Sequence, residues 1–153
     1  MADKLNIELK NFNGKKIKIA IILPYFNEKI GMELFKNCKK ELLQNNIPEK
    51  NIQLFRVPGC LEIPLSAKKI IKKYDGIIAL VVVIRWETKH FELVTETTYS
   101  ALMNIQLEAM TPIIFEILAC ENLKQAQKRA SEKGLNKGKE AAISALLQIN
   151  FMK

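Results

Sequence analysis

The sequence Gly-Ile-Ile-Ala-Leu-Val-Val-Val-Ile, residues 76–84, contains the longest unbroken apolar run of the chain. It is rich in β-branched side chains and shows no alternation of apolar and polar residues. Such a run is typical of a strand that is buried on both faces of a parallel sheet. A helix that spans a bilayer needs about 20 apolar residues, so this run is too short for a membrane segment.

Three further segments are predicted to join this strand in one sheet. Residues 18–23 and 112–118 are short and apolar in the same way. Residues 51–57 carry the polar side chains of Gln53 and Arg56, which favours an edge strand.

Helical patterns separate the four strands. One helix follows residue 27, one follows Pro64, a long one covers residues 91–108, and one begins at Asn122 with Gln125 as a capping-box partner. The apolar faces of the first two consist of Ile30, Leu34, Phe35, Cys38 and Leu42, and of Ala67, Ile70, Ile71 and Tyr74. The order β-α-β-α-β-α-β-α-α predicts one α/β domain over residues 1–153, with helices on both faces of a parallel sheet. The polar residues 1–15 are expected to be an arm that pairs with a neighbouring molecule.

Composition narrows the class of protein. Apolar residues make up 48% of the chain and charged residues 26%, which is typical of a globular domain. The net charge of +8 includes lysine doublets at residues 39–40, 68–69 and 72–73 without interleaved aromatic residues, which favours solvated helix faces over nucleic-acid binding. Cys38, Cys60 and Cys120 are widely spaced and odd in number, which argues against disulfides or a metal site and favours the cytoplasm.

The loops that follow the strands carry the candidate site. Phe26 follows the first strand, Glu62 the second, and Thr88 and His90 the third. Parallel sheets bind ligands beyond the carboxyl ends of their strands, so these side chains are expected to converge on one edge. An aromatic ring with a few polar groups is the usual makeup of a small-molecule pocket.

These segments resemble the lumazine synthase family over almost the whole chain. The matching runs are Phe26-Asn27, Val57-Pro58-Gly59-Cys60-Leu61-Glu62-Ile63-Pro64, Val83-Ile84-Arg85 with Thr88 and His90, and Asn122-Leu123-Lys124-Gln125-Ala126-Gln127-Lys128-Arg129-Ala130 with Lys133, Asn136, Lys137 and Gly138. The resemblance implies a flavodoxin-like three-layer sandwich with a four-stranded parallel sheet. It also implies pentamers, often twelve of them in an icosahedral shell of sixty subunits, with active sites between adjacent subunits.

The resemblance further implies a reaction in riboflavin biosynthesis. The family condenses 5-amino-6-ribitylaminouracil with 3,4-dihydroxy-2-butanone 4-phosphate, without metal or organic cofactor. The products are 6,7-dimethyl-8-ribityllumazine, orthophosphate and water. The expected partners are therefore these small molecules, phosphate and further copies of the chain, with no nucleic acid and no membrane.

The same resemblance assigns roles to individual positions. Phe26 stacks on the pyrimidine and Asn27 lies near the ribityl chain, whose hydroxyls are held by Gly59, Cys60, Leu61 and Glu62. Val83 and Ile84 meet the pyrimidine edge through backbone groups, and Glu87 and Thr88 bind the phosphate. His90 moves protons and Arg129 contacts the phosphate. Phe115, Arg129, Lys133 and Lys137 come from the neighbouring subunit.

The residue types agree with this chemistry, although each has a simpler reading. Histidine suits the proton transfers of imine formation, phosphate elimination and ring closure, and arginine binds phosphate bidentately. Without the resemblance, His90 is a polar residue at the start of a helix, Phe26 a strand-end aromatic and Arg129 a solvated charge. A nucleophilic role for Cys60 lacks an orienting third group.

Several positions depart from the family pattern. Val81, Trp86 and Glu116 stand where glycine is usual, and Ser131-Glu132 stands where Gly-Thr is frequent. Val81 is expected to crowd the sheet, Trp86 to hinder phosphate, and Glu116 to place a carboxylate in a buried strand. These departures leave a second hypothesis open, namely a catalytically impaired or engineered protein that retains only the assembly of the shell.

Overall fold

A computed structural model describes residues 5, 7–9 and 12–153, and its centre is one parallel sheet. The strands are β1 (Ile19–Pro24), β2 (Ile52–Val57), β3 (Gly76–Ile84) and β4 (Ile113–Cys120). Their order in the sheet is β2-β1-β3-β4, and every neighbouring pair is parallel. This confirms the predicted four-stranded parallel sheet.

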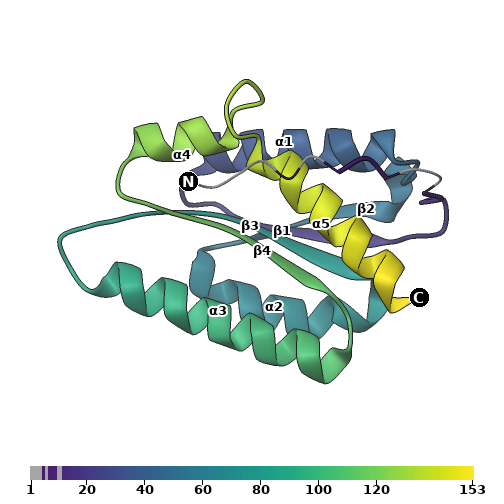
Figure 1. The fold of residues 1–153 in the computed structure, drawn as a ribbon. Helices are drawn as coiled ribbons and strands as arrows, with labels where there is room; N and C mark the ends of the chain where they lie inside the picture. The colour runs from purple at the N-terminus through teal and green to yellow at the C-terminus, as the bar shows by residue number, and fades with distance from the viewer. Residues whose placement is uncertain (1–4, 6, 10–11) are drawn as a thin grey trace.

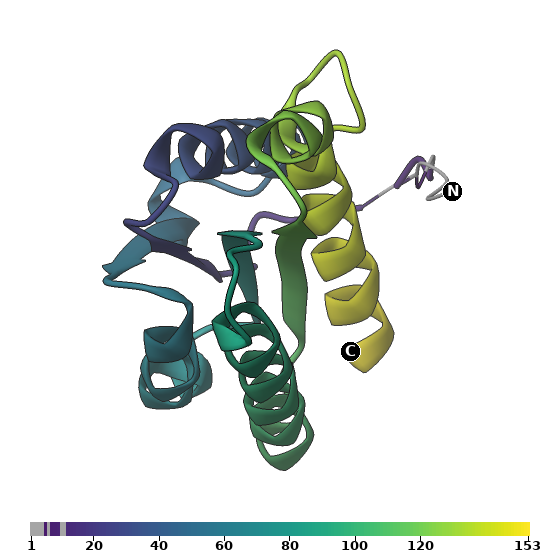
Figure 2. The same ribbon diagram turned by 90° about the vertical axis from the view of Figure 1, so that its left-hand side faces the viewer.

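Helices cover both faces of the sheet. They are α1 (Glu28–Gln44), α2 (Ile63–Ile70), α3 (His90–Ala109), α4 (Leu123–Ala130) and α5 (Lys137–Met152), with single 3₁₀ turns at Glu49–Asn51, Cys60–Glu62 and Ile71–Lys73. Helices α1, α4 and α5 lie on one face, and α2 and α3 lie on the other (Figure 1). The turned view shows the sheet between the two helical layers (Figure 2), which makes the fold the expected flavodoxin-like sandwich.

The apolar pattern explains this arrangement. In β3, residues 76–82 are buried because they face helices on both sides and strands on both edges. Their side chains divide between two cores. One core contains Leu34, Leu118 and Leu146, and the other contains Ile63 and Leu102. By contrast, five of the six residues in β2 are at least partly exposed, as predicted for an edge strand.

The expected crowding at Val81 does not disturb the sheet. Val81 is 1% exposed and pairs with Ile117, within a register that continues unbroken from Ile77 to Ile84. Its side chain is part of the core beneath α3. The sheet therefore accommodates valine at this position with regular pairing.

The predicted cap of α4 forms with one change. The side-chain oxygen of Asn122 accepts a hydrogen bond from the Gln125 N–H at 2.9 Å. The side-chain oxygen of Gln125 accepts from the N–H of Glu121, one residue before the N-cap, also at 2.9 Å. The two bonds satisfy backbone donors at the start of α4 and fix the chain as it leaves β4.

Two expectations concern the chain beyond the sandwich. The proposed N-terminal arm lies largely outside the described residues, because residues 1–4, 6 and 10–11 are not among them. Of the helices in the described part of the chain, none has the length and apolar character to span a membrane.

Candidate active site

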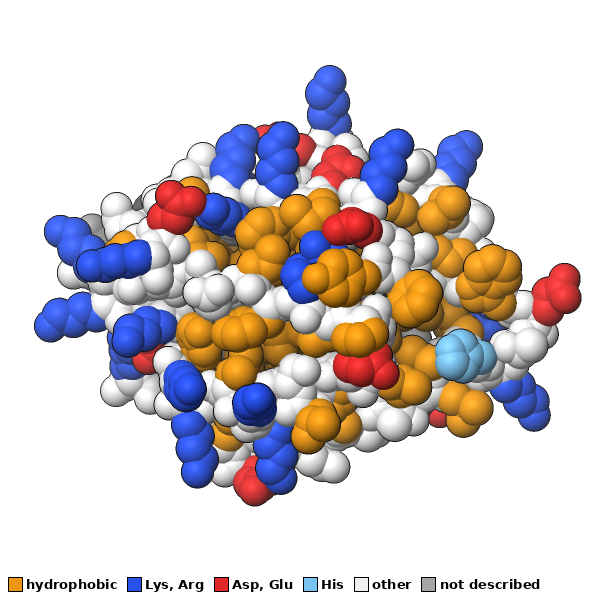
Figure 3. Space-filling view, turned by 180° about the vertical axis from the view of Figure 1, so that it is seen from behind, with side chains coloured by type: hydrophobic (Ala, Val, Ile, Leu, Met, Phe, Trp, Pro, Cys, Tyr) orange, Lys and Arg blue, Asp and Glu red, His pale blue; other side chains and the backbone are white. Residues whose placement is uncertain are grey.

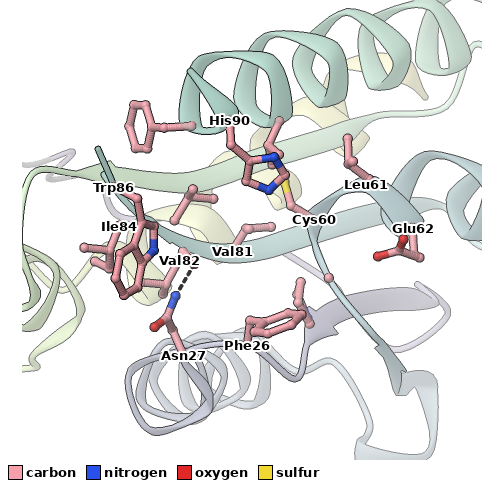
Figure 4. Close-up of a pocket in the computed structure, with 15 residues that line it drawn as sticks. Phe26, Asn27, Cys60, Leu61, Glu62, Val81, Val82, Ile84, Trp86 and His90 are labelled. Carbon is pink, nitrogen blue, oxygen red and sulfur yellow. Dashed lines mark hydrogen bonds between the residues drawn. The ribbon is translucent and has the colours of Figure 1, made fainter. Parts of the chain in front are cut away.

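A cavity of about 360 Å³ opens at the carboxyl edge of the sheet, where the loops after β1, β2 and β3 meet. The close-up shows Phe26, Glu62, Trp86 and His90 around its mouth (Figure 4). In the space-filling view, the imidazole of the single histidine lies among apolar side chains (Figure 3). The cavity is lined by Pro24, Phe26, Asn27, Gly59, Cys60, Leu61, Glu62, Val81, Val82, Val83, Ile84, Trp86, His90, Phe91 and Val94.

Phe26 presents its ring to the cavity. It lies two residues after the end of β1 and remains 73% exposed, which is unusual for a large apolar side chain. Gly59 packs closely against this ring. A Cβ at residue 59 would lie 3.1 Å from a Glu62 carboxylate oxygen and 3.4 Å from the Phe26 ring. A glycine at residue 59 therefore lets an aromatic face and a carboxylate approach the same backbone.

Asn27 links the first loop to β3. Its backbone adopts the left-handed conformation (φ 57°, ψ 37°), which asparagine tolerates better than most residues. Its side-chain amide donates a hydrogen bond to the carbonyl oxygen of Val82 at 2.9 Å instead of capping α1. The amide thus takes up one backbone acceptor of the pocket wall and holds the Phe26 loop in place.

Cys60 is a buried thiol in the cavity wall. It donates a hydrogen bond to the hydroxyl of Thr98 at 3.3 Å. Burial is the main cause that raises the pKa of this thiol, while the bond with Thr98 opposes the rise. A thiol in its neutral form is a poor nucleophile, and the side chain lines the pocket wall.

His90 is the first residue of α3 and lies at the cavity mouth. The backbone N–H of His90 donates to the hydroxyl of Thr88 at 3.4 Å. The N-cap residue, Lys89, makes no side-chain capping bond. The imidazole is exposed and so can exchange protons with a bound molecule or with water.

A second cavity adjoins the first along the loop between β3 and α3. It is lined by Arg85, Trp86, Glu87, Thr88 and Glu121. The Arg85 guanidinium donates to Glu121 at 2.9 Å and to Glu92. The hydrogen bond from Arg85 is the main cause that lowers the pKa of the exposed Glu92 carboxyl. Arg85 is the only cation among the described residues that line this cavity, and it is already paired with two carboxylates. An anion bound there would therefore need a positive charge from elsewhere.

Trp86 stands between the two cavities and borders both. Its indole is 75% exposed and lies beside Asn27 and Ile84 in the close-up (Figure 4). Trp86 therefore adds an aromatic wall while leaving the first cavity open.

Four predicted residues lie away from the cavity of their own chain. The Phe115 ring packs against Tyr99 at 5.8 Å between centroids, and Arg129 donates to the carbonyl oxygen of Gln125 at 3.3 Å. Lys133 lies in the turn between α4 and α5. Lys137 forms a 2.9 Å ion pair with Glu140. These are the residues that the resemblance assigns to a neighbouring subunit.

Glu116 is the carboxylate expected in a buried strand. It lies in β4 opposite Leu80 and is partly buried. Desolvation raises its pKa to about 7, while the positive charge of Lys137 opposes the rise. Burial in the strand therefore favours the neutral form of the Glu116 carboxyl.

Other lining residues were missed from the sequence. Phe91 and Val94 extend the wall along the first turn of α3, and Pro24 and Val82 complete it. The signal for the first two was their spacing of one and four residues from His90, which places all three near one end of a helix. Their apolar character made them indistinguishable from ordinary core residues.

Comparisons with a family profile and with individual relatives point to the same family. Residues 16–153 match the profile of the 6,7-dimethyl-8-ribityllumazine synthase family. A 6,7-dimethyl-8-ribityllumazine synthase of Pediococcus pentosaceus is 42% identical over 145 residues, which cover 94% of this chain and 93% of the relative. One from Leuconostoc mesenteroides subsp. mesenteroides is 41% identical over 136 residues, which cover 88% and 87% of the two chains.

Proposed function

The chain belongs to the 6,7-dimethyl-8-ribityllumazine synthase family, and we propose that its sheet-edge cavity is the site at which 5-amino-6-ribitylaminouracil and 3,4-dihydroxy-2-butanone 4-phosphate condense. The product is 6,7-dimethyl-8-ribityllumazine, and the condensation is a step of riboflavin biosynthesis. The observation that carries the proposal is one cavity that unites an aromatic ring, a carboxylate and the only histidine.

The ribitylaminouracil occupies the end of the cavity formed by Phe26 and Glu62. The exposed Phe26 ring offers a flat apolar face to the pyrimidine. The Glu62 carboxylate and the backbone from Gly59 to Leu61 accept and donate hydrogen bonds to the ribityl hydroxyls. Asn27 lies near the same chain, and the backbone of Val83 and Ile84 meets the pyrimidine edge.

The phosphate of the second substrate lies along the loop that contains Glu87 and Thr88. The Thr88 hydroxyl and the loop amides donate to it. Since Arg85 is already paired with Glu92 and Glu121, the compensating charge is expected from Arg129 of a neighbouring chain. A phosphate site formed by Thr88 of one chain and Arg129 of the next agrees with the absence of Arg129 from the lining of the cavity in its own chain.

His90 moves the protons of the reaction. The 5-amino group attacks the ketone carbonyl and loses water to form an imine. Abstraction of a proton from the adjacent carbon then expels orthophosphate. The elimination leaves an enol, which tautomerises to a ketone. The ribityl-bearing amine closes the second ring by attack on this new carbonyl, with loss of a second water. Each step transfers a proton, and the His90 imidazole at the cavity mouth is placed to accept and return it.

The assembly is a closed homo-oligomer. Five chains form a pentamer, and twelve pentamers form a shell of sixty subunits. Exposed apolar side chains support an interface on α3 and the end of α5, including Leu107 (63% exposed), Met110 (67%) and Phe151 (81%). Phe115, Lys133 and Lys137 join Arg129 at the neighbouring site. The three free, buried cysteines agree with a reducing cytoplasm.

A steady-state assay with both substrates tests the proposed function. The chain should form the lumazine faster than the uncatalysed mixture and release one orthophosphate for each product. A folded, assembled protein that gives only the uncatalysed rate would favour the alternative of an impaired shell-forming protein. The comparisons favour the enzyme, since both relatives are synthases by name.

A further inference from the structure

Arg85 connects three elements at the carboxyl edge of the sheet. Its backbone N–H donates to the carbonyl oxygen of Cys120 at the end of β4, at 2.9 Å. Its side chain donates to Glu121 at 2.9 Å and to Glu92 in the first turn of α3. The guanidinium carbon also lies 4.3 Å from the centre of the Phe91 ring. One residue thus joins the ends of β3 and β4 to the start of α3.

The loop of residues 85–89 depends on these contacts. Among the described residues, the only other side-chain hydrogen bond of the loop is the long one between Thr88 and the His90 N–H, at 3.4 Å. Helix α3 begins with Lys89 at its N-cap and His90 as its first residue, and Lys89 makes no capping bond. An acidic side chain in the first turn stabilises a helix N-terminus. Glu92 supplies the negative charge, and Arg85 holds Glu92 in place.

We propose that Arg85 is a positioning residue for the condensation reaction. Its guanidinium, fixed between Glu92 and Glu121, sets the position of the loop and of the first turn of α3. These two segments carry Thr88 at the phosphate end and His90 at the cavity mouth. The inference rests on the proposed function and concerns a residue whose guanidinium is already paired with two carboxylates.

The geometry requires arginine rather than a positive charge alone. The contacts to Glu92 and Glu121 leave the guanidinium from different nitrogens, Nη1 and Nε, while its central carbon lies over the Phe91 ring. A lysine has one ammonium group and no planar face, so it cannot reproduce the fork and the stacking together.

Substitution of Arg85 tests the proposal in the full-length, assembled protein. Arg85→Gln removes the charge and the fork. Lys39→Gln is the matched control, because it removes the cation of another ion pair, Lys39–Glu49 at 2.7 Å, between α1 and a turn before β2. Time-resolved anisotropy of Trp86, the only tryptophan, reports local motion of the loop. Steady-state kinetics with each substrate varied in turn report the site.

The expected result is selective. Arg85→Gln should speed the local motion of Trp86 and lower kcat/KM for the phosphorylated butanone by on the order of ten- to a hundredfold through misplacement of the loop. The Kd of ribitylaminouracil should change by less than about twofold, because Phe26 and Glu62 are unaffected. Glu121→Gln should act in the same direction, and adding it to Arg85→Gln should bring no further loss. Lys39→Gln should match the wild type in both measurements.

The proposal is overturned if Arg85→Gln folds with unchanged Trp86 motion and unchanged kinetics. It is equally overturned if both substrates lose affinity to the same extent, since that result indicates a general structural defect. If Arg85→Gln fails to fold, Glu121→Gln decides by the same two readouts. A wild-type chain without turnover would contradict the proposed function. The Trp86 motion would still decide whether Arg85 fixes the loop.

Discussion

In the proposed reaction, His90 is the residue on which proton transfer depends most. It is the only histidine of the chain, and its imidazole lies at the cavity mouth. We predict that His90→Ala lowers kcat by about ten- to a thousandfold, which is the range that one general acid–base group contributes. Binding of ribitylaminouracil, measured by calorimetry, should change little because Phe26 and Glu62 remain. An unaltered kcat would show that water or another group carries the protons.

Glu116 makes the stability of the chain depend on pH. The pKa of its carboxyl is raised from 4.5 to about 7, mainly by desolvation. Between these values the folded chain keeps a proton that the unfolded chain has released. Stability from this group is therefore present below pH 4.5 and is lost as the pH rises through about 7.

Substitution of Glu116 should remove this dependence. We predict that Glu116→Gln raises the Tm at pH 8 but has little effect at pH 5, with a gain of at most about 3 kcal/mol at the higher pH. Thermal unfolding at the two pH values, at equal protein concentration, measures the difference. The same gain at both pH values would show that packing, rather than ionisation, controls this position.

At the residue scale, the sequence predicted the cavity residues that follow strands better than the apolar ones on α3. Phe26, Glu62 and His90 could be placed because each follows a predicted strand, and parallel strands end at the same edge. Phe91 and Val94 could not, because an apolar residue on a helix looks the same whether it faces a core or a cavity. The exposure of Trp86 likewise depends on the path of the loop, which no local pattern determines.

Among the elements, the loop between β3 and α3 is the most informative to probe. Trp86 borders both cavities, and the phosphate is proposed to lie beside Thr88. We predict that titration with inorganic phosphate changes the emission of Trp86. Thr88→Val, which removes the hydroxyl donor at nearly the same volume, should weaken this response. Emission that stays constant up to saturating phosphate would place the anion elsewhere.

Helix α4 should depend on its cap. Asn122 accepts a hydrogen bond from the Gln125 N–H at 2.9 Å, and α4 has only eight residues. We predict that Asn122→Ala lowers the free energy of unfolding by about 1 kcal/mol, a typical value for loss of an N-cap. Chemical denaturation measures the loss. Asn122→Ser, which retains a capping oxygen, should keep most of the stability, and equal losses in both variants would argue against the cap.

Element types were predictable from the sequence, whereas their ends were less so. The long strand β3 was predicted at its observed limits, because its apolar run is bounded on both sides by polar residues. For β1, the prediction began at Lys18, whose backbone instead bonds with Asp75 through its N–H and carbonyl oxygen. For β4, the prediction ended at Leu118, whereas backbone pairing with Val83 and Ile84 continues the strand to Cys120. Both differences arise from pairing with distant segments.

At the scale of the whole molecule, the residues proposed for catalysis lie in two separate regions of the fold. The loops after β1, β2 and β3 bring Phe26, Glu62 and His90 to one cavity. Arg129 lies on α4, on the other face of the sheet from α3 (Figure 1). The proposed phosphate site needs an additional cation, and Arg129 lies outside the cavity of its own chain. Both observations fit a ring of identical chains in which each chain completes the site of its neighbour.

Mixing two inactive variants tests this account most directly. His90→Ala and Arg129→Ala should each have little activity alone, and both should sediment as assemblies much larger than the 17.5 kDa chain. After dissociation and random reassembly at equal ratio, about a quarter of the sites should combine an intact His90 with an intact Arg129 from the next chain. We therefore predict that lumazine formation recovers to about a quarter of the wild-type rate. Reassembled mixtures no more active than the two variants measured separately would contradict a site shared between subunits.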